Sequence, residues 1–433
     1  MKVLILSAEV WQDGTNGGNV LSNIFSDMNF ELAQVYCNPG VPENNCCTRY
    51  YQMTDSMVLH SFLRHKPIGN AFSQGIKTMQ NADSATAERP NRRFYAFFHR
   101  HRLGVFYATR SLAWNYSNWK NERLRDFIRK FNPNVIFAPC YGDIFMLRLT
   151  RFAAELTGKR VISYISDDSY TLQQLSFSPY YWLNRFLVRS QLRKTFPYYA
   201  LVYTMTQAQK EQCEQDFGAN MKLLLKSVDL SALEPKKDVR KPIRIVYAGG
   251  VYLNRYKTLS ALSKVIEQLN AGSDQELFCL DIYTDNEMTR QIIAALDHDG
   301  TTMHKAVSQE ELRQIYSESD IALHVESFDL KNRLKVRMSF STKITDCLGS
   351  GCAVMAICDE KQGGFLYLKE NDAAFCVSDL QQLSVLLKRI AAEPELILLY
   401  AQKARECCFR NHDSETIRKM IGEDFKHYEG CTD

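Results

Sequence analysis

The sequence has 433 residues, of which 45% are hydrophobic and 24% are charged, and its formal net charge at pH 7 is +4. A chain of this length can bury two or three cores, and its charge is too small to indicate a nucleic-acid partner. Thirteen cysteines without a CxxC pair indicate reduced thiols, and no apolar run approaches the ~18 residues that span a bilayer, so we expect a cytoplasmic protein.

The first half of the chain alternates apolar strands with helices. Residues 2–7 are continuously apolar, as in a parallel strand buried on both faces, and lead into a turn containing Gly17 and Gly18. Further strands are expected at 31–37, 134–139, 160–165, 199–204 and 221–225, and helices at 20–25, 122–131, 144–159 and 207–217. Residues 39–87 show no clear pattern. The alternation predicts a doubly wound α/β domain over residues 1–229.

The glycines after the first strand are candidate ligand-binding residues. Without a Cβ, Gly17 and Gly18 let backbone amides approach a ligand closely. The spacing matches neither GxGxxG nor a P-loop, so a plain turn is the alternative.

A charged stretch with two prolines, residues 230–242, predicts a linker. The alternation then restarts, with strands expected at 243–248, 277–283, 321–325 and 352–357 and helices at 258–270, 288–296 and 310–318. We therefore predict a second α/β domain over residues 243–405, followed by a helical tail at 406–433.

The segment 339–357, SFSTKITDCLGSGCAVMAI, combines a hydroxyl cluster, a short helix and a strand. Hydroxyl groups and free amides at a helix start suit a phosphate, which makes Ser341, Thr342 and Lys343 candidates for binding one. Asp346 lies one turn after Thr342 on the same face, where a carboxylate can accept hydrogen bonds from a ribose. The alternative is an ordinary connection in which the hydroxyl groups only cap the helix.

Two cations follow another turn. Arg255 and Lys257 come after the strand at 243–248 and the pair Gly249 and Gly250. An arginine and a lysine beside flexible backbone suit a diphosphate, although helix starts also carry surface cations without a ligand.

Segment 339–357 resembles the donor-site segment of GT-B glycosyltransferases of the family 4 type. Phe340 and Ser341 stand where that family has Phe-Gly, and Asp346 stands at its second acidic position, which binds ribose hydroxyls. The resemblance is closer to a bacterial branch that carries Ser-Thr-Lys here and makes capsular and surface polysaccharides. It implies two Rossmann-like domains facing across a cleft, with the donor in the second domain, the acceptor in the first, and the last helix packing back on the first.

The resemblance also implies a site and an activity. A sugar would pass, with retention, from a nucleotide-diphosphate sugar to a glycan or a polyprenyl-linked glycan, with Arg255 and Lys257 neutralising the leaving diphosphate in place of a metal and no cofactor involved. The implied donor-binding residues are Gly17, Gly18, Gly249, Gly250, Arg255, Lys257, Tyr283, Val307, Ser341, Thr342, Lys343 and Asp346.

One position departs from the family pattern. The acid expected eight residues before Asp346 is Met338 in this chain. Glu326 or Asp329 could supply that carboxylate, and we take Glu326 as the catalytic candidate. The missing acid leaves two alternatives open: a nucleotide-sugar-binding protein without activity, and a nucleotide-sugar epimerase on the same fold.

Turns after two strands of the first domain supply the acceptor candidates, Tyr141, Asp143, Asp167 and Asp168. Asp143 is the candidate for orienting an acceptor hydroxyl or taking its proton. The alternative is that these aspartates cap the following helices, in which case the leaving phosphate accepts the proton, as the resemblance to retaining enzymes implies.

Two basic, aromatic segments, 91–104 and 180–194, predict peripheral contact with an anionic membrane at the inner face of the cell. Arg185, Arg189 and Arg193 would form one stripe of the second segment. The alternative is a solvated face over an ordinary core, and nothing in either segment matches an RNA-binding module.

Overall fold

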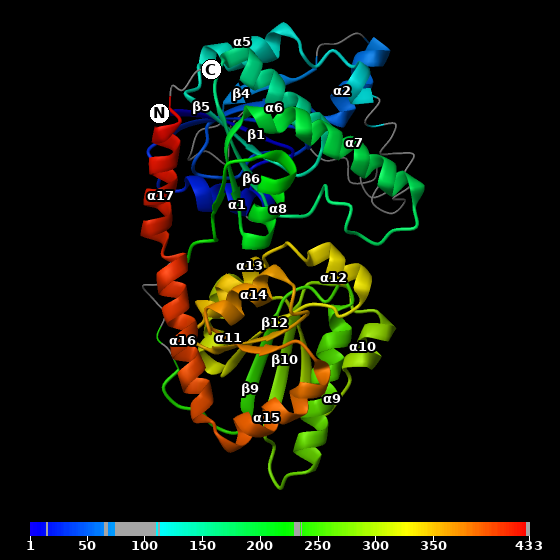
Figure 1. The fold of residues 1–433 in the computed structure, drawn as a ribbon, viewed down its shortest axis with the longest axis vertical. Helices are drawn as coiled ribbons and strands as arrows, with labels where there is room; N and C mark the ends of the chain where they lie inside the picture. Colours follow the sequence, from blue (N-terminus) through cyan, green and yellow to red (C-terminus); the bar gives the residue numbers. More distant parts are fainter. Residues whose placement is uncertain are drawn as a thin grey trace.

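The computed structural model describes residues 1–13, 16–64, 68–73, 110, 113–228, 234 and 236–429. Within them the chain forms two α/β domains stacked along the long axis of the molecule (Figure 1). Each domain has its own sheet, which confirms the predicted architecture of two doubly wound domains.

The first domain contains an eight-stranded sheet in the order β4-β3-β2-β1-β5-β6-β7-β8. Every pair is parallel except β3 with β4. The chain order reverses between β1 and β5, where ligands bind in such sheets. The elements are β1 (Lys2–Ser7), α1 (Asn16–Phe25), β2 (Glu31–Tyr36), β3 (Arg49–Gln52), α2 (Asp55–Arg64), β4 (Asn70–Ser73), α5 (Glu122–Phe131), β5 (Val135–Pro139), α6 (Ile144–Thr157), β6 (Val161–Ile165), α7 (Pro179–Thr195), η1 (Phe196–Tyr198), β7 (Tyr199–Thr204), α8 (Gln207–Phe217) and β8 (Met221–Leu223).

Three of these elements, β3, α2 and β4, lie in the region where the sequence shows no clear pattern. Strand β3 is only four residues long, RYYQ, with Tyr50 and Tyr51 buried on opposite faces of the sheet. A strand this short has too few residues for an alternating pattern to stand out.

The second domain contains a six-stranded parallel sheet in the order β11-β10-β9-β12-β13-β14. Its elements are β9 (Ile243–Ala248), α9 (Arg255–Ala271), β10 (Phe278–Thr284), α10 (Arg290–Leu296), β11 (Thr301–Lys305), α11 (Gln309–Glu318), β12 (Ile321–Val325), α12 (Leu330–Val336), α13 (Thr342–Leu348), β13 (Ala353–Ile357), α14 (Gly363–Glu370), β14 (Phe375–Val377), η2 (Leu380–Gln382) and α15 (Leu383–Ala392). Lys236, within the predicted linker, contacts this domain, because its Nζ lies 3.1 Å from a carboxylate oxygen of Asp320.

Two helices follow, α16 (Glu395–His412) and α17 (Ser414–His427). Figure 1 shows α16 against the second domain and α17 along the first. Phe425 of α17 packs on Phe25 and Phe137, with ring centroids 5.8 and 6.1 Å apart. The tail thus packs back on the first domain, but the crossing begins at Asp413 and not at the predicted boundary of 405, because the Asp413 side chain caps a separate helix.

The chain crosses between the domains at two adjacent places. Val228 N donates to the carbonyl oxygen of His412 at 2.9 Å, and Nδ1 of His412 lies 2.8 Å from the carbonyl oxygen of Lys226. We call residues 226–228 and 412–413 the hinge pair.

Candidate active site

The carboxyl ends of β9 and β12 hold a buried ion pair. Arg255, the first residue of α9, donates from Nε and Nη2 to the two carboxylate oxygens of Glu326 at 2.8 and 2.6 Å. Both side chains are almost fully buried. Burial opposes the charge on Arg255, but the contact with Glu326 outweighs it and raises the pKa of the guanidinium. The bidentate geometry fixes the guanidinium plane, so Glu326 positions Arg255.

This pairing differs from the predicted role of Glu326 as a sugar-contacting catalytic group, because both of its oxygens already accept hydrogen bonds. The other acid considered, Asp329, caps α12 and accepts a hydrogen bond from Asn254. Among the described residues, Nη1 of Arg255 has no hydrogen-bond partner although it is buried. An anion is the natural acceptor for such a donor.

Lys343, in the first turn of α13, places a second cation beside Arg255. Its amine lies so close to Gly249 that a Cβ there would be 2.1 Å from Nζ. Nζ also lies 5.5 Å from the ring centroid of Tyr247. Among the described residues, no carboxylate is within ion-pairing distance of this amine. Burial, with Arg255 second, lowers the pKa of Lys343 to about 8.

A histidine beneath these cations is neutral. His324 of β12 is fully buried, and its Nε2 has no partner among the described residues. Burial first, then Arg255 and Lys343, lowers its pKa to about 3. The two cations therefore face one paired carboxylate, Glu326, which makes this site net positive.

Lys257, predicted to act with Arg255, faces elsewhere. Residues that are two positions apart in an α-helix are about 200° apart around its axis, so the side chains of Arg255 and Lys257 point in nearly opposite directions. Arg255 is buried and Lys257 is exposed. The structure thus joins Arg255 to Lys343 rather than to Lys257.

The hydroxyl groups at the start of α13 do not cap the helix. Ser341 occupies the N-cap position without a side-chain hydrogen bond to the helix, and Thr342 is exposed. Asp346, predicted to bind ribose, lies one turn further on. Its carboxylate accepts a hydrogen bond at 2.6 Å from Nζ of Lys226, which belongs to the first domain. Asp346, the candidate for binding ribose, is therefore already ion-paired with Lys226 of the hinge pair.

The remaining donor candidates lie at the ends of neighbouring strands. The ring of Tyr283 stacks on His304, with centroids 4.4 Å apart. Val307 is half-buried just before the N-cap of α11. Gly250 accepts a hydrogen bond from the hydroxyl of Tyr247 at 2.7 Å, which fixes the turn after β9.

The glycines after β1 lie in the first turn of α1 and not in the loop before it. A Cβ at Gly17 would be 2.0 Å from Oε2 of Glu9, and a Cβ at Gly18 would strike the backbone of Gln12. Both positions need glycine for this close approach. The carboxylate of Glu9 already lies against this helix start, where the amides favour a negative charge.

The acceptor candidates divide into two pairs. Asp143 caps α6, as the alternative prediction states, and pairs with Arg110 at 3.2 Å. Asp168 has a fully buried side chain that pairs with Arg185 at 2.7 Å. Their oxygens are engaged in the first domain, so the structure does not offer Asp143 or Asp168 to a ligand.

The other pair, Tyr141 and Asp167, stays accessible at the ends of β5 and β6. Asp167 accepts a hydrogen bond at 2.9 Å from Ser339 of the second domain. Partial burial, and then the charges of Glu9 and Asp167, raises the pKa of Tyr141. Glu9, Tyr141 and Asp167 therefore lie after β1, β5 and β6, three neighbouring strands of the sheet.

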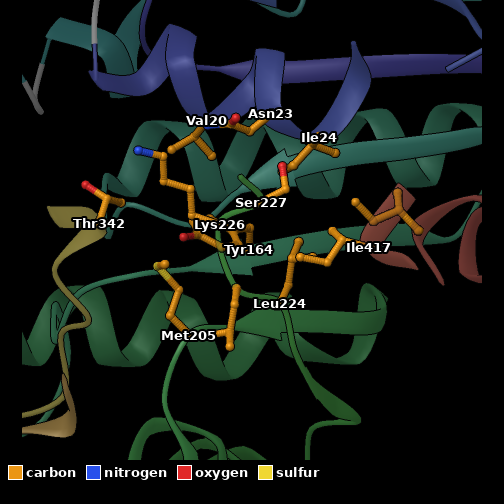
Figure 2. A pocket seen from close by; sticks show the side chains of 12 residues that line it. Val20, Asn23, Ile24, Tyr164, Met205, Leu224, Lys226, Ser227, Thr342 and Ile417 are labelled. Atoms are coloured by element: carbon orange, nitrogen blue, oxygen red, sulfur yellow. The ribbon is translucent and has the colours of Figure 1, made fainter. Parts of the chain in front are cut away.

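A small cavity of about 40 Å³ lies between the domains on the side of the hinge pair. Figure 2 shows Val20 and Asn23 above it, with Thr342, Lys226 and Tyr164 around it. Arg255 is not among its lining residues, and the volume is too small for a nucleotide.

Sequence reasoning missed Glu9, Lys226 and His324. Glu9 comes two residues after the last residue of the first strand, so the rule that ligands bind at strand ends could have found it. Lys226 and His324 carry no such signal, because only the folded chain brings them to Asp346 and Arg255.

Residues 275–420 match the profile of a family described as glycosyl transferase-like. No curated protein sequence gives a significant match. Among the described residues, no helix is both long and apolar enough to cross a bilayer, and no three His, Cys, Asp or Glu side chains gather to hold a metal ion.

Similar solved structures share the fold along the whole chain. HepE of Anabaena, in complex with UDP, is 12% identical with a TM-score of 0.62, and the match covers 99% of this chain and 100% of that chain. Sucrose-phosphate synthase of Thermosynechococcus elongatus is 11% identical with a TM-score of 0.62, covering 99% of each. The UDP-forming α,α-trehalose-phosphate synthase of Burkholderia vietnamiensis is 12% identical with a TM-score of 0.56, covering 99% and 100%. The chain thus has the GT-B fold, and its residues 275–420 are similar to the glycosyl transferase-like family.

Proposed function

We propose that the protein is a glycosyltransferase that moves a sugar from a nucleotide-diphosphate sugar to a glycan acceptor, with retention and without a metal, in the synthesis of a surface polysaccharide. The observation that carries the proposal is the pair Arg255 and Lys343. Arg255 is held by Glu326, and Lys343 lies beside it without a paired carboxylate among the described residues, at the strand ends of the second domain.

The pair suits a diphosphate for a physical reason. The free Nη1 of Arg255 is a directional donor, and the amine of Lys343 is a point charge with no paired carboxylate among the described residues. Both are largely withdrawn from water, so each interacts more strongly with a phosphate than an exposed cation does. Charge that develops on the leaving diphosphate is stabilised here, and this lowers the barrier of the transfer step.

The acceptor would bind at Tyr141 and Asp167, which face the donor domain through Ser339. Asp167 is the acidic group left open by the engagement of Asp143 and Asp168. In a retaining transfer the leaving phosphate takes the acceptor proton, so Asp167 needs only to orient the hydroxyl. This role rests on the family resemblance and on the exposure of Asp167.

One observation favours a second function. Met338, at the position where the family has an acid, is buried, and its carbonyl oxygen accepts a hydrogen bond from Thr206. A donor sugar therefore lacks that carboxylate, and a nucleotide-sugar-binding protein without activity remains the alternative. Nucleotide-sugar binding without turnover would identify it, whereas product formation without an acceptor would identify an epimerase.

The test is a thermal-shift assay with UDP, GDP, CDP, ADP and TDP, without added metal, on the wild type and three variants. A nucleotide at about 100 times its Kd stabilises the folded protein by about 2.7 kcal/mol. We expect one nucleotide to do so, and we expect Arg255→Ala and Lys343→Ala to abolish the shift. Lys264→Ala, which removes an exposed cation from the same helix as Arg255, is the matched control.

Adding Lys257→Ala separates the sequence prediction from the structure. Loss of the shift in Lys257→Ala with retention in Lys343→Ala would show that the second cation has been assigned to the wrong residue. Absence of a shift with all five nucleotides would overturn the proposal.

A further inference from the structure

The first domain exposes several large apolar side chains on α7 and on the loop before it. Phe177 is 95% exposed, and Leu183 and Phe186 of α7 are 58% and 54% exposed. We call this the α7 surface, and its exposed apolar members are Leu172, Leu175, Phe177, Leu183, Phe186 and Leu187. Six such side chains within 16 residues are more than the scattered apolar residues of an ordinary protein surface.

The helix presents these side chains as one stripe. Leu183, Phe186 and Leu187 have helical spacing i, i+3, i+4, and the stripe continues through Ser190 to Arg193 and Lys194, all exposed. It is apolar near the start of α7 and cationic near its end.

The arginines expected to form the exposed stripe mostly face inward. Arg185 pairs with Asp168, and Arg189 pairs with Asp216 at 2.8 Å. The exposed side chains of segment 180–194 are therefore mostly others than the arginines that the sequence analysis named. The second predicted segment, 91–104, lies outside the described residues.

Charge indicates the kind of partner. From residue 169 to residue 210 the sequence has no Asp or Glu, but it has three arginines and two lysines. Arg185, Arg189 and Lys210 pair with carboxylates outside this span. Arg193 and Lys194 are exposed and have no ion pair among the described residues, so they carry the positive charge of this surface. An acidic partner is therefore attracted and a second copy of this surface is repelled. Apolar side chains beside unpaired cations match a bilayer with anionic headgroups, which offers an apolar interior below a negative surface.

The loop before α7 also contacts the second domain. Gln174, in the loop that carries Leu172, Leu175 and Phe177, donates to Asp168 and to the carbonyl oxygen of Leu334 in α12. Figure 1 shows this loop passing from the first domain to the level of α12. A membrane on the α7 surface would therefore lie next to the site.

We propose that the α7 surface docks on an anionic lipid bilayer, with its apolar side chains at the headgroup boundary and Arg193 and Lys194 on the headgroups. Together with the proposed function, docking defines the acceptor class as a glycan carried on a membrane lipid. The docking itself does not depend on the protein being a glycosyltransferase.

The test is co-sedimentation of the full chain with vesicles of phosphatidylcholine alone and with added phosphatidylglycerol. We expect the wild type to bind the anionic vesicles. Phe186→Glu should weaken binding about tenfold or more, since a buried Phe side chain is worth that factor. Neutralising Arg193 and Lys194 to Gln should weaken it about fivefold for each cation. Val385→Glu, at a 71% exposed apolar position of the second domain, is the matched control and should bind as the wild type does.

Two readouts keep the outcomes separate. The nucleotide thermal shift, measured without vesicles, should be unchanged in all four proteins, which shows that they are folded and tests the donor site independently. Failure of the wild type to bind anionic vesicles, or equal binding by Phe186→Glu, would overturn the docking proposal. A concentration-dependent dimer in sedimentation velocity that Phe186→Glu abolishes would assign the surface to a second copy instead.

Discussion

Replacing Lys343 by Met should stabilise the ligand-free protein while removing its response to nucleotide. The variant keeps a flexible apolar chain of similar length beside Gly249 but deletes the amine. Burial lowers the pKa of this amine to about 8 from its usual 10.5. A lowered pKa means that the fold disfavours the charged form of this lysine.

The magnitude follows from that pKa. A difference of about 2.5 pH units corresponds to about 3.4 kcal/mol for a fully effective shift. Because Lys343 keeps some solvent exposure, we expect about 2 kcal/mol, or roughly 4–8 °C in the unfolding midpoint of the second domain.

The pH dependence gives the sign of the effect. Below pH 8 the amine is charged in both states, and the folded wild type carries the full cost. Between about pH 8 and 10.5 the unfolded state binds more protons than the folded state, so the free energy of unfolding of the wild type rises relative to that of the variant. The advantage of Lys343→Met should therefore shrink across this window and vanish above it.

The assay is thermal unfolding of wild type, Lys343→Met and the exposed control Lys264→Met from pH 7 to pH 10.5, with and without the nucleotide that stabilises the wild type. A Lys343→Met protein that is less stable than the wild type at pH 7, or an advantage that does not change with pH, would show that the amine is not a strained, unpaired cation.

Three further predictions follow from other contacts. Glu326→Gln should lower the free energy of unfolding by about 3 kcal/mol, because it leaves Arg255 buried without a counter-charge, and the midpoint of the second domain's transition measures it. Lys226→Met frees Asp346 and should tighten nucleotide binding up to about fivefold by titration calorimetry; unchanged affinity would mean that Asp346 does not reach the ribose. Phe425→Ala should cost about 3–5 kcal/mol by leaving a cavity under α17, and equal thermal stability would contradict the packing described here.

The sequence supported the architecture because buried parallel strands leave a strong local signal. Residues 2–7, 243–248 and 321–325 are short apolar runs followed by turns, and each is a strand in the structure. The short strand β3 and the edge strand β11, TTMHK, lack such a run and were not predicted.

The candidate site was predictable only in part, since tertiary packing decides which side chains meet. Arg255 and Lys257 are close in sequence, but the turn of the helix separates them, and Lys343 comes from a segment 88 positions after Arg255. In the same way, Asp168 pairs with the buried Arg185, which is 17 positions away in the sequence. No residue next to Asp168 in the sequence indicates this contact.

The hinge pair constrains how the two halves of the protein can move. The two segments of the hinge pair are hydrogen-bonded to each other, so they favour rotation of one domain against the other about a single axis over sliding or twisting. In such a rotation, the displacement of one domain relative to the other grows with distance from the axis. The cavity beside Lys226 would change little, and the contact between Gln174 and Leu334 would move further. If the halves swing, the hydrogen bond between Gln174 and Leu334 must break, so its removal should change rates of ligand exchange more than strength of binding.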